Sequence, residues 1–180
     1  LVFNPYSIDD LQKKYKREPV YTADIIIDGN KNESSIEKSK ISIRTDGDGD
    51  LKIWAVPNCL KVENRYLVSV DIGGKSSTSD YTVMTVIDRF DMMPSLKGKP
   101  KVVARWRGHV RHDKLAWMAA ALAHYYDDAL LVIESNTADR EKNNNTEGDH
   151  FGSILNEIAD YYDNLYQRTT SPEDVSDNVL

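Results

Sequence analysis

The sequence contains a single cysteine, Cys59, among 180 residues. This excludes an internal disulfide framework and a cysteine-based metal site, so we expect a reducing, cytoplasmic compartment. Long apolar runs are also missing, because the longest, residues 115–123, is far shorter than the roughly 18 residues of a membrane span. We therefore expect no membrane partner. A content of 40% apolar and 29% charged residues instead predicts a soluble globular domain with its own core.

Two short motifs begin like known binding loops but are incomplete. Residues 74–76, Gly-Lys-Ser, match the end of a phosphate-binding P-loop, yet that pattern needs a glycine where Ser69 stands. Residues 46–50 imitate the start of a calcium loop, but Leu51 and Pro57 replace its glycine and glutamate. The sequence therefore predicts neither a P-loop nor a calcium site, and residues 46–50 are expected to form a solvated turn.

The net charge of −6 hides a strong polarity along the chain. Residues 97–114 contain seven lysines and arginines against one acid, whereas residues 127–180 contain thirteen acids against three basic residues. A basic run is either a solvated surface or a contact for phosphates, and both interpretations remain open here. If it contacts the DNA backbone, the residues expected to do so are Arg105, Arg107 and Arg111. Lys75, in the loop after Asp71, is also placed to meet a phosphate.

Residues 1–60 read as an approach segment or linker, and residues 61–180 as one domain. In the first part, Ser7 is expected to cap a short helix that ends near Lys16. Residues 41–44 and 51–54 are expected to pair as a small hairpin across the turn at residues 45–50.

From residue 66 the pattern becomes regular. Short stretches rich in valine, isoleucine and threonine predict three consecutive strands, and an apolar stretch predicts a later, buried strand. Apolar residues at helical spacing predict one helix before that strand and another after it. The expected elements are strands at Leu67–Ile72, Thr82–Asp88 and Lys101–Arg107, a helix capped by Asp113 and ending near Tyr126, a strand at Leu130–Ser135, and a helix over Phe151–Leu165.

This order predicts an α/β, ribonuclease H-like fold: three antiparallel strands, a helix, a strand parallel to the first, and a helix. If the fourth strand lies beside the first, Asp71 and Glu134 meet at their carboxyl ends. Two neighbouring carboxylates repel each other unless they share a proton or a cation. We therefore expect Asp71 and Glu134 to hold Mg²⁺ or Mn²⁺, with two ions as used in phosphodiester hydrolysis.

Four stretches make the chain resemble the C-terminal nuclease domain of the large terminase subunit of tailed bacteriophages. They are VSVDIGG with Asp71, SDYTVMTVIDR with Asp80, RWRGHVRHDKLA, and LLVIESNT with Glu134. The resemblance covers about residues 58–168. It implies a ribonuclease H-like fold and two metal ions, with Asp71 and Glu134 as catalytic ligands and Asp80 as a supporting acid.

The resemblance also implies a role. Members of the family cut concatemeric double-stranded DNA during packaging, and they work with the terminase ATPase domain, the small terminase subunit and the portal. A phage or prophage protein in the cytoplasm of a bacterial host is the implied setting. The family's further aspartate follows a fifth strand, which this chain does not reach, so a C-terminally incomplete fold and a third ligand beyond residue 180 are expected.

Two other classes of function share parts of the pattern. Actin-like and sugar-kinase phosphotransferases also lead their first strand into an Asp-x-Gly loop, although they need a second phosphate loop and an adenosine site. A non-catalytic DNA-binding or assembly module would keep the basic run and carry the acids as relics.

Overall fold

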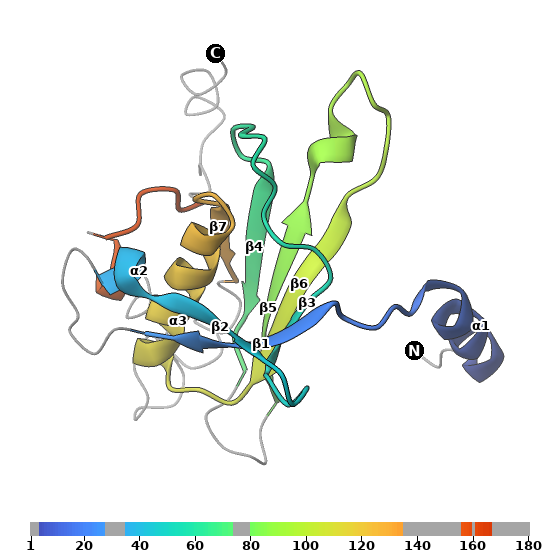
Figure 1. The fold of residues 1–180 in the computed structure, drawn as a ribbon, viewed down its shortest axis with the longest axis horizontal. Coiled ribbons are helices and arrows are strands. Elements are labelled where there is room, and N and C mark those ends of the chain that lie inside the picture. Colours follow the sequence, from blue (N-terminus) through green and yellow to red (C-terminus); the bar gives the residue numbers. More distant parts are fainter. Residues whose placement is uncertain (1–3, 28–34, 74–79, 135–155, 160, 167–180) are drawn as a thin grey trace, which may run out of the picture.

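The computed structural model describes residues 4–27, 35–73, 80–134, 156–159 and 161–166. Seven strands form one mixed sheet in the order β2-β1-β3-β6-β5-β4-β7 (Figure 1). The helices are α1 (Pro5–Tyr15), α2 (Ser35–Lys38) and α3 (His112–Tyr125), with a short 3-10 turn at Phe90–Met92. The strands are β1 (Tyr21–Ile26), β2 (Lys40–Arg44), β3 (Leu51–Ile53), β4 (Tyr66–Asp71), β5 (Thr82–Asp88), β6 (Lys101–Gly108) and β7 (Leu130–Ile133).

Strands β4, β5 and β6 form an antiparallel meander, and β7 lies parallel to β4 after the α3 crossover. Parallel strands need such a crossover because no tight turn can reverse the chain between them. This is the order of a ribonuclease H-like sheet, so the predicted fold class is confirmed. The predicted final helix is shorter in the described residues: positions 156–158 are helical, and Leu165 bridges to Leu131.

One face of the sheet builds the core. Alternate residues of β4 and β5, such as Val68 and Met84, are fully buried on the side that α3 covers. Helix α3 is rich in alanine and is buried at every position from Leu115 to Ala123. A helix that is apolar all round must be covered on several sides, and Ile158 and Tyr162 belong to the same core cluster.

The first sixty residues differ from the prediction of a linker, because β1, β2 and β3 extend the same sheet. The predicted hairpin between residues 41–44 and 51–54 is wrong, since β2 and β3 both pair with β1, which lies between them. β3 then joins β6 through Leu51 and Ile53, which are fully buried. The boundary expected near residue 60 therefore does not divide the sheet.

Both helix caps differ from those expected. Helix α1 begins at Pro5, and the side chain of Asn4 accepts a hydrogen bond from the Tyr6 N–H, so Ser7 is not the cap. Helix α3 begins one residue before Asp113, with Arg111 at the cap position and no side-chain capping bond. Proline suits the first helical position because its missing N–H has no partner there in any case.

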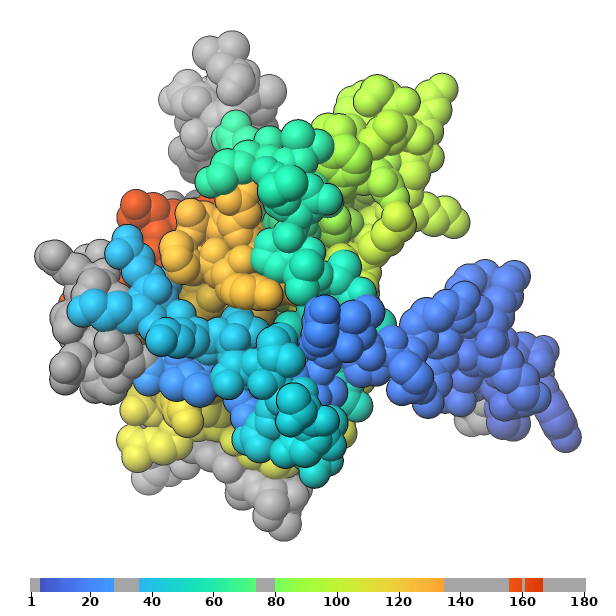
Figure 2. Space-filling model, in the orientation of Figure 1, coloured from blue at the N-terminus to red at the C-terminus, as the bar shows by residue number. Residues whose placement is uncertain are grey.

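Helix α1 stands apart from the sheet, and the connection between β5 and β6 also projects from it (Figures 1 and 2). No residue of α1 is buried. None of the described helices is long and apolar enough to cross a membrane.

Candidate functional site

The two acids predicted to form the site come from neighbouring parallel strands. Asp71 is the last residue of β4, and Glu134 follows the last residue of β7. The ladder pairs Val70 with Ile133, and the Glu134 N–H donates to the Val70 carbonyl at 3.0 Å. The next step of this register places Asp71 beside Glu134, at the carboxyl ends of both strands. The structure therefore brings the two acids together.

The two carboxyl groups lie close enough to interact, because Glu134 acts on the pKa of Asp71 through a side-chain hydrogen bond and through its charge. Such a bond requires that one carboxyl carries a proton. Desolvation raises the pKa of Asp71 above its ordinary value, and the hydrogen bond and the negative charges of Glu134 and Asp80 raise it further. The surroundings of this pair thus favour either a shared proton or a bound cation.

The third predicted ligand, Asp80, lies just before β5 and is exposed. It is close enough for its charge to act on Asp71. Among the residues that the structure describes, however, no group of three or more histidine, cysteine, aspartate or glutamate side chains is arranged to hold a metal. Asp80 therefore does not complete a three-residue ligand group in this arrangement.

The end of β4 is held against the start of β5 by close backbone contact. The Gly73 N–H donates to the Thr82 hydroxyl at 2.9 Å. A side chain at Gly73 would place its Cβ 2.3 Å from the Tyr81 carbonyl carbon and 2.4 Å from the Asp80 oxygen. Only glycine fits this approach, which fixes how the chain leaves Asp71.

The chemistry of the pair suits a divalent cation. Both groups offer carboxylate oxygens, the ligands that Mg²⁺ and Mn²⁺ prefer. They stand on the exposed end of two hydrogen-bonded strands, so backbone geometry rather than mobile loops sets their separation. Asp71 and Glu134 are thus the described residues that would hold such an ion.

The predicted DNA contacts are distributed over three places. Arg105 and Arg107 are exposed on the same face of β6, and Arg111 is exposed just before α3. Arg111 forms an ion pair with Asp113 at 3.2 Å, and this negative charge weakens the attraction of Arg111 for a phosphate. Lys75 lies outside the described residues.

A stack beside the acidic pair was not predicted from the sequence. The guanidinium of Arg107 lies 3.5 Å from the ring centroid of Tyr81, and the His109 ring stacks on Tyr81 with centroids 4.3 Å apart. Val83 pairs with Asp71 on one side and Arg107 on the other, so this stack lies two strands from Asp71. The signal in the sequence was an aromatic residue, Tyr81, directly before β5. The pairing of β5 with β6 places this residue beside β6.

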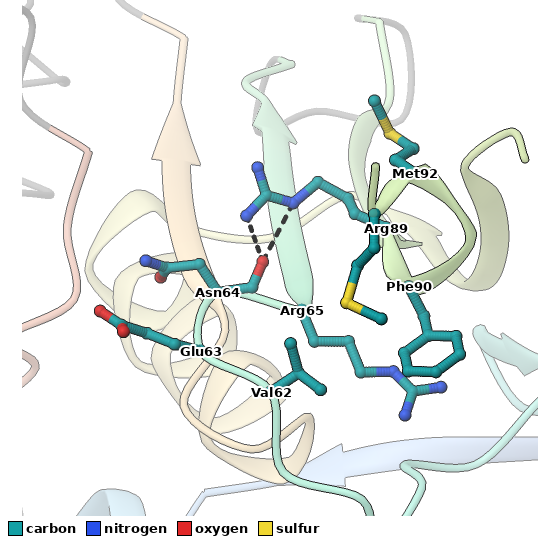
Figure 3. A pocket seen from close by; sticks show the side chains of 8 residues that line it. Val62, Glu63, Asn64, Arg65, Arg89, Phe90 and Met92 are labelled. Carbon is teal, nitrogen blue, oxygen red and sulfur yellow. Dashed lines mark hydrogen bonds between the residues drawn. The ribbon is translucent and has the colours of Figure 1, made fainter. Parts of the chain in front are cut away.

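A separate pocket lies at the opposite end of β4 (Figure 3). Its arginines have structural partners: Arg65 binds Asp88, and Arg89 donates to the Asn64 carbonyl. Because Tyr66 and Asp88 pair at one end of the β4-β5 ladder and Asp71 and Val83 at the other, this pocket is remote from the acidic pair.

Comparisons with known proteins give little beyond this geometry. No protein-family model matches the chain, and no curated protein matches it. Among solved structures, the large terminase nuclease from thermophilic phage G20c is similar, with 16% sequence identity and a TM-score of 0.46. The match covers 71% of this chain and 55% of that chain, so the chain spans about half the length of the solved protein. Similarity at this level assigns neither a family nor an activity to the chain.

Proposed function

We propose that this chain is a metal-dependent DNA endonuclease domain of the terminase type. The observation that carries the proposal is the juxtaposition of Asp71 and Glu134 at the carboxyl ends of adjacent parallel strands. A structural role explains this arrangement poorly, because two like charges side by side destabilise a fold unless they share a proton or a cation. The terminase assignment is supported by the sequence resemblance around Asp71, Asp80 and Glu134.

In this proposal each residue of the site has a distinct task. Asp71 and Glu134 hold the first of two divalent cations, and Asp80 adds negative charge that attracts the second. Bound Mg²⁺ or Mn²⁺ supplies positive charge for the attacking and leaving oxygens of a phosphodiester. Arg105 and Arg107, on the sheet face that also carries Asp71, contact the phosphates of double-stranded DNA without reading bases.

The proposed setting is a DNA-packaging machine in an infected or lysogenic bacterial cell. The partners would be the ATPase domain of the terminase, its small subunit and the portal. These assignments rest on the sequence resemblance alone.

The test is cleavage of supercoiled plasmid with Mg²⁺, Mn²⁺ or a chelator. We expect slow nicking that Mn²⁺ favours, because two carboxylates bind a second ion weakly and Mn²⁺ binds such ligands more tightly than Mg²⁺. Asp71→Asn and Glu134→Gln should each lower the rate at least about 100-fold, since even outer-shell partners of a metal are worth 10- to 100-fold. Asp9→Asn, on the exposed surface of α1, is the matched control and should leave the rate unchanged.

Two outcomes would contradict the proposal: nicking that persists in chelator, or full activity in Asp71→Asn. Unchanged DNA binding with no nicking under any metal would favour the non-catalytic DNA-binding module. Binding of ATP would favour the phosphotransferase alternative.

A further inference from the structure

A groove with a volume of ≈ 510 Å³ lies between the segment that follows α1 and strands β3 and β6. Its floor is ordered, because the Trp54 indole N–H donates to the Arg17 carbonyl at 2.9 Å and the Val20 N–H donates to the Ile53 carbonyl at 2.8 Å. Figure 2 shows an open recess between α1 and the projecting β5-β6 connection. The groove is lined by the end of α1 and the segment that follows it, and by residues of β6 and of the β3 region. The cations that line the groove are Lys16, Arg17, Lys52, Lys101 and Arg105.

Two of these cations lie directly opposite each other in the sheet, where their repulsion lowers its stability. Lys52 and Arg105 are direct cross-strand partners on β3 and β6, and both are exposed. Like charges directly opposite each other destabilise an antiparallel pair. In the described part of the chain, neither side chain forms an ion pair, so an anionic ligand would relieve the repulsion that the fold itself leaves in place.

Two of the other cations have acidic partners. Lys101 forms an ion pair with Asp91 at 2.5 Å, and Lys16 lies 3.4 Å from Glu18. Among the described residues, the positive charge without an acidic partner therefore lies on Arg17, which donates to the Lys14 and Lys16 carbonyls, and on the cross-strand pair in the floor of the groove.

Aromatic and apolar side chains also face the groove. Tyr15 is 61% exposed and Val102 52% exposed, and Trp54 is half-buried. A basic groove with aromatic walls is typical of sites for single-stranded nucleic acid, because unpaired bases stack on the rings while the phosphates meet the cations. A duplex keeps its bases stacked inside and would gain nothing from the aromatic walls.

The groove and the acidic pair lie on the same face of the sheet. Arg105 pairs with Thr85, which pairs with Ser69, two residues before Asp71. Two strand spacings and two residues along β4 separate the Cα atoms of Arg105 and Asp71 by about 12 Å. A few nucleotides of one DNA strand suffice to span this distance.

We propose that this groove binds one unpaired DNA strand, with its phosphates at Lys52 and Arg105 and its bases against Tyr15 and Trp54. The bound strand then leads toward Asp71 and Glu134. The inference rests on the proposed nuclease function and deepens it, because it assigns a single-stranded segment of the substrate to a defined surface.

The experiment measures the anisotropy of a labelled 15-nucleotide oligo-dT and of a 15-base-pair duplex in chelator over a series of salt concentrations. The double variant Lys52→Gln/Arg105→Gln should bind oligo-dT at least tenfold more weakly, and its salt slope should fall by about 1.4, since each phosphate contact on a single strand contributes about 0.7. Tyr15→Ala should weaken oligo-dT binding about tenfold and leave duplex binding unchanged. The matched control, Lys38→Gln/Lys61→Gln, removes the same charge from two exposed positions outside the groove.

Oligo-dT binding by the groove variant that equals wild type would overturn the inference, as would an equal loss of duplex binding in Tyr15→Ala. If plasmid nicking still requires Mn²⁺ and Asp71 in either case, the nuclease proposal stands and only the groove assignment fails. If wild type binds neither DNA and shows no nicking, both fail together.

Discussion

The side chain of Arg65 shows how one buried charge organises the end of β4 opposite the acidic pair. It donates from Nε and Nη2 to both carboxylate oxygens of Asp88, at 3.0 and 2.8 Å. Its guanidinium also lies 4.6 Å from the ring centroid of Phe90. The side chains of Arg65 and Asp88 are only 8% and 16% exposed, so removing one partner would leave the other charge without compensation in a dry site.

We predict that Asp88→Asn lowers the free energy of unfolding by about 3 kcal/mol at pH 7. The control Asp9→Asn breaks the exposed Lys13–Asp9 pair and should cost less than about 0.5 kcal/mol. Urea denaturation of both variants measures the difference. Equal, small effects would show that the buried pair adds nothing to stability.

The same pair predicts a pH dependence. Burial acts to raise the pKa of Asp88, but the hydrogen bonds from Arg65 and the Phe90 N–H and the charge of Arg65 together lower it. A lowered pKa means that the stabilisation is complete above the unfolded value, about 3.9, and is lost as pH falls through the folded value. The stability gap between wild type and Asp88→Asn should therefore narrow below about pH 4, whereas a constant gap would contradict this cause.

At the scale of residues, the sequence predicts the two neighbouring acids but neither the helix cap at Asn4 nor the buried ion pair. Asp71 and Glu134 could be found because each follows a run of alternating or apolar residues that marks a strand end. The cap at Asn4 was missed although Pro5 was a usable signal, because Ser7 is an equally good capping residue. The Arg65–Asp88 pair depends on the register of β4 and β5, which no local pattern specifies.

At the scale of elements, the close approach of Gly73 to the start of β5 fixes how the chain leaves Asp71. Gly73 allows the chain to pass within van der Waals contact of the backbone that leads into β5. Any larger residue must push the two strand ends apart, which would also move the carboxylate of Asp71 relative to Glu134.

We predict that Gly73→Ala destabilises the fold by about 1–3 kcal/mol and weakens Mn²⁺ binding at least tenfold. Gly47→Ala is the control, because Gly47 has φ of +83° in a turn outside the site. It should lower stability without changing the affinity for Mn²⁺. Isothermal titration with Mn²⁺ below the unfolding temperature separates the two effects, and equal affinities in the two variants would refute a role for Gly73 in the site.

Strands β4 to β7 and helix α3 lie close to their predicted bounds, and so do α1, β2 and β3. The pairing of β2 with β3 was wrong, β1 was not predicted, and the final helix is shorter in the described residues. β5 was predicted at its observed bounds because it is a short stretch rich in valine, isoleucine and threonine. β3 has only three residues, and it is held by β1 and by β6, some fifty residues away in the chain. The strand itself was predicted, but its partners were not, because no local pattern specifies them.

At the scale of the whole molecule, strands β1, β2 and β3 from the first sixty residues are part of the sheet. Leu51, Ile53 and Ala23 are fully buried, and β3 covers the edge of β6. A fragment without them would expose that edge and part of the core, which favours aggregation or loss of structure. Helix α1, in contrast, buries no residue.

We therefore predict that a fragment of residues 61–180 loses cooperative thermal unfolding, whereas deletion of residues 1–14 leaves the melting temperature within about 3 °C of wild type. Circular dichroism during heating measures both. A fragment 61–180 that unfolds as cooperatively as wild type would restore the boundary expected near residue 60.

The central claim, that Asp71 and Glu134 hold a divalent cation, is tested most directly by an anomalous difference map from crystals grown with Mn²⁺. We predict a strong peak about 2.1 Å from carboxylate oxygens of both residues, with a weaker second peak nearby. Peaks elsewhere in the crystal but none at this pair would contradict the claim, as would carboxyl groups more than about 8 Å apart, since ligand distances of about 2.1 Å cannot bridge that gap even with two ions.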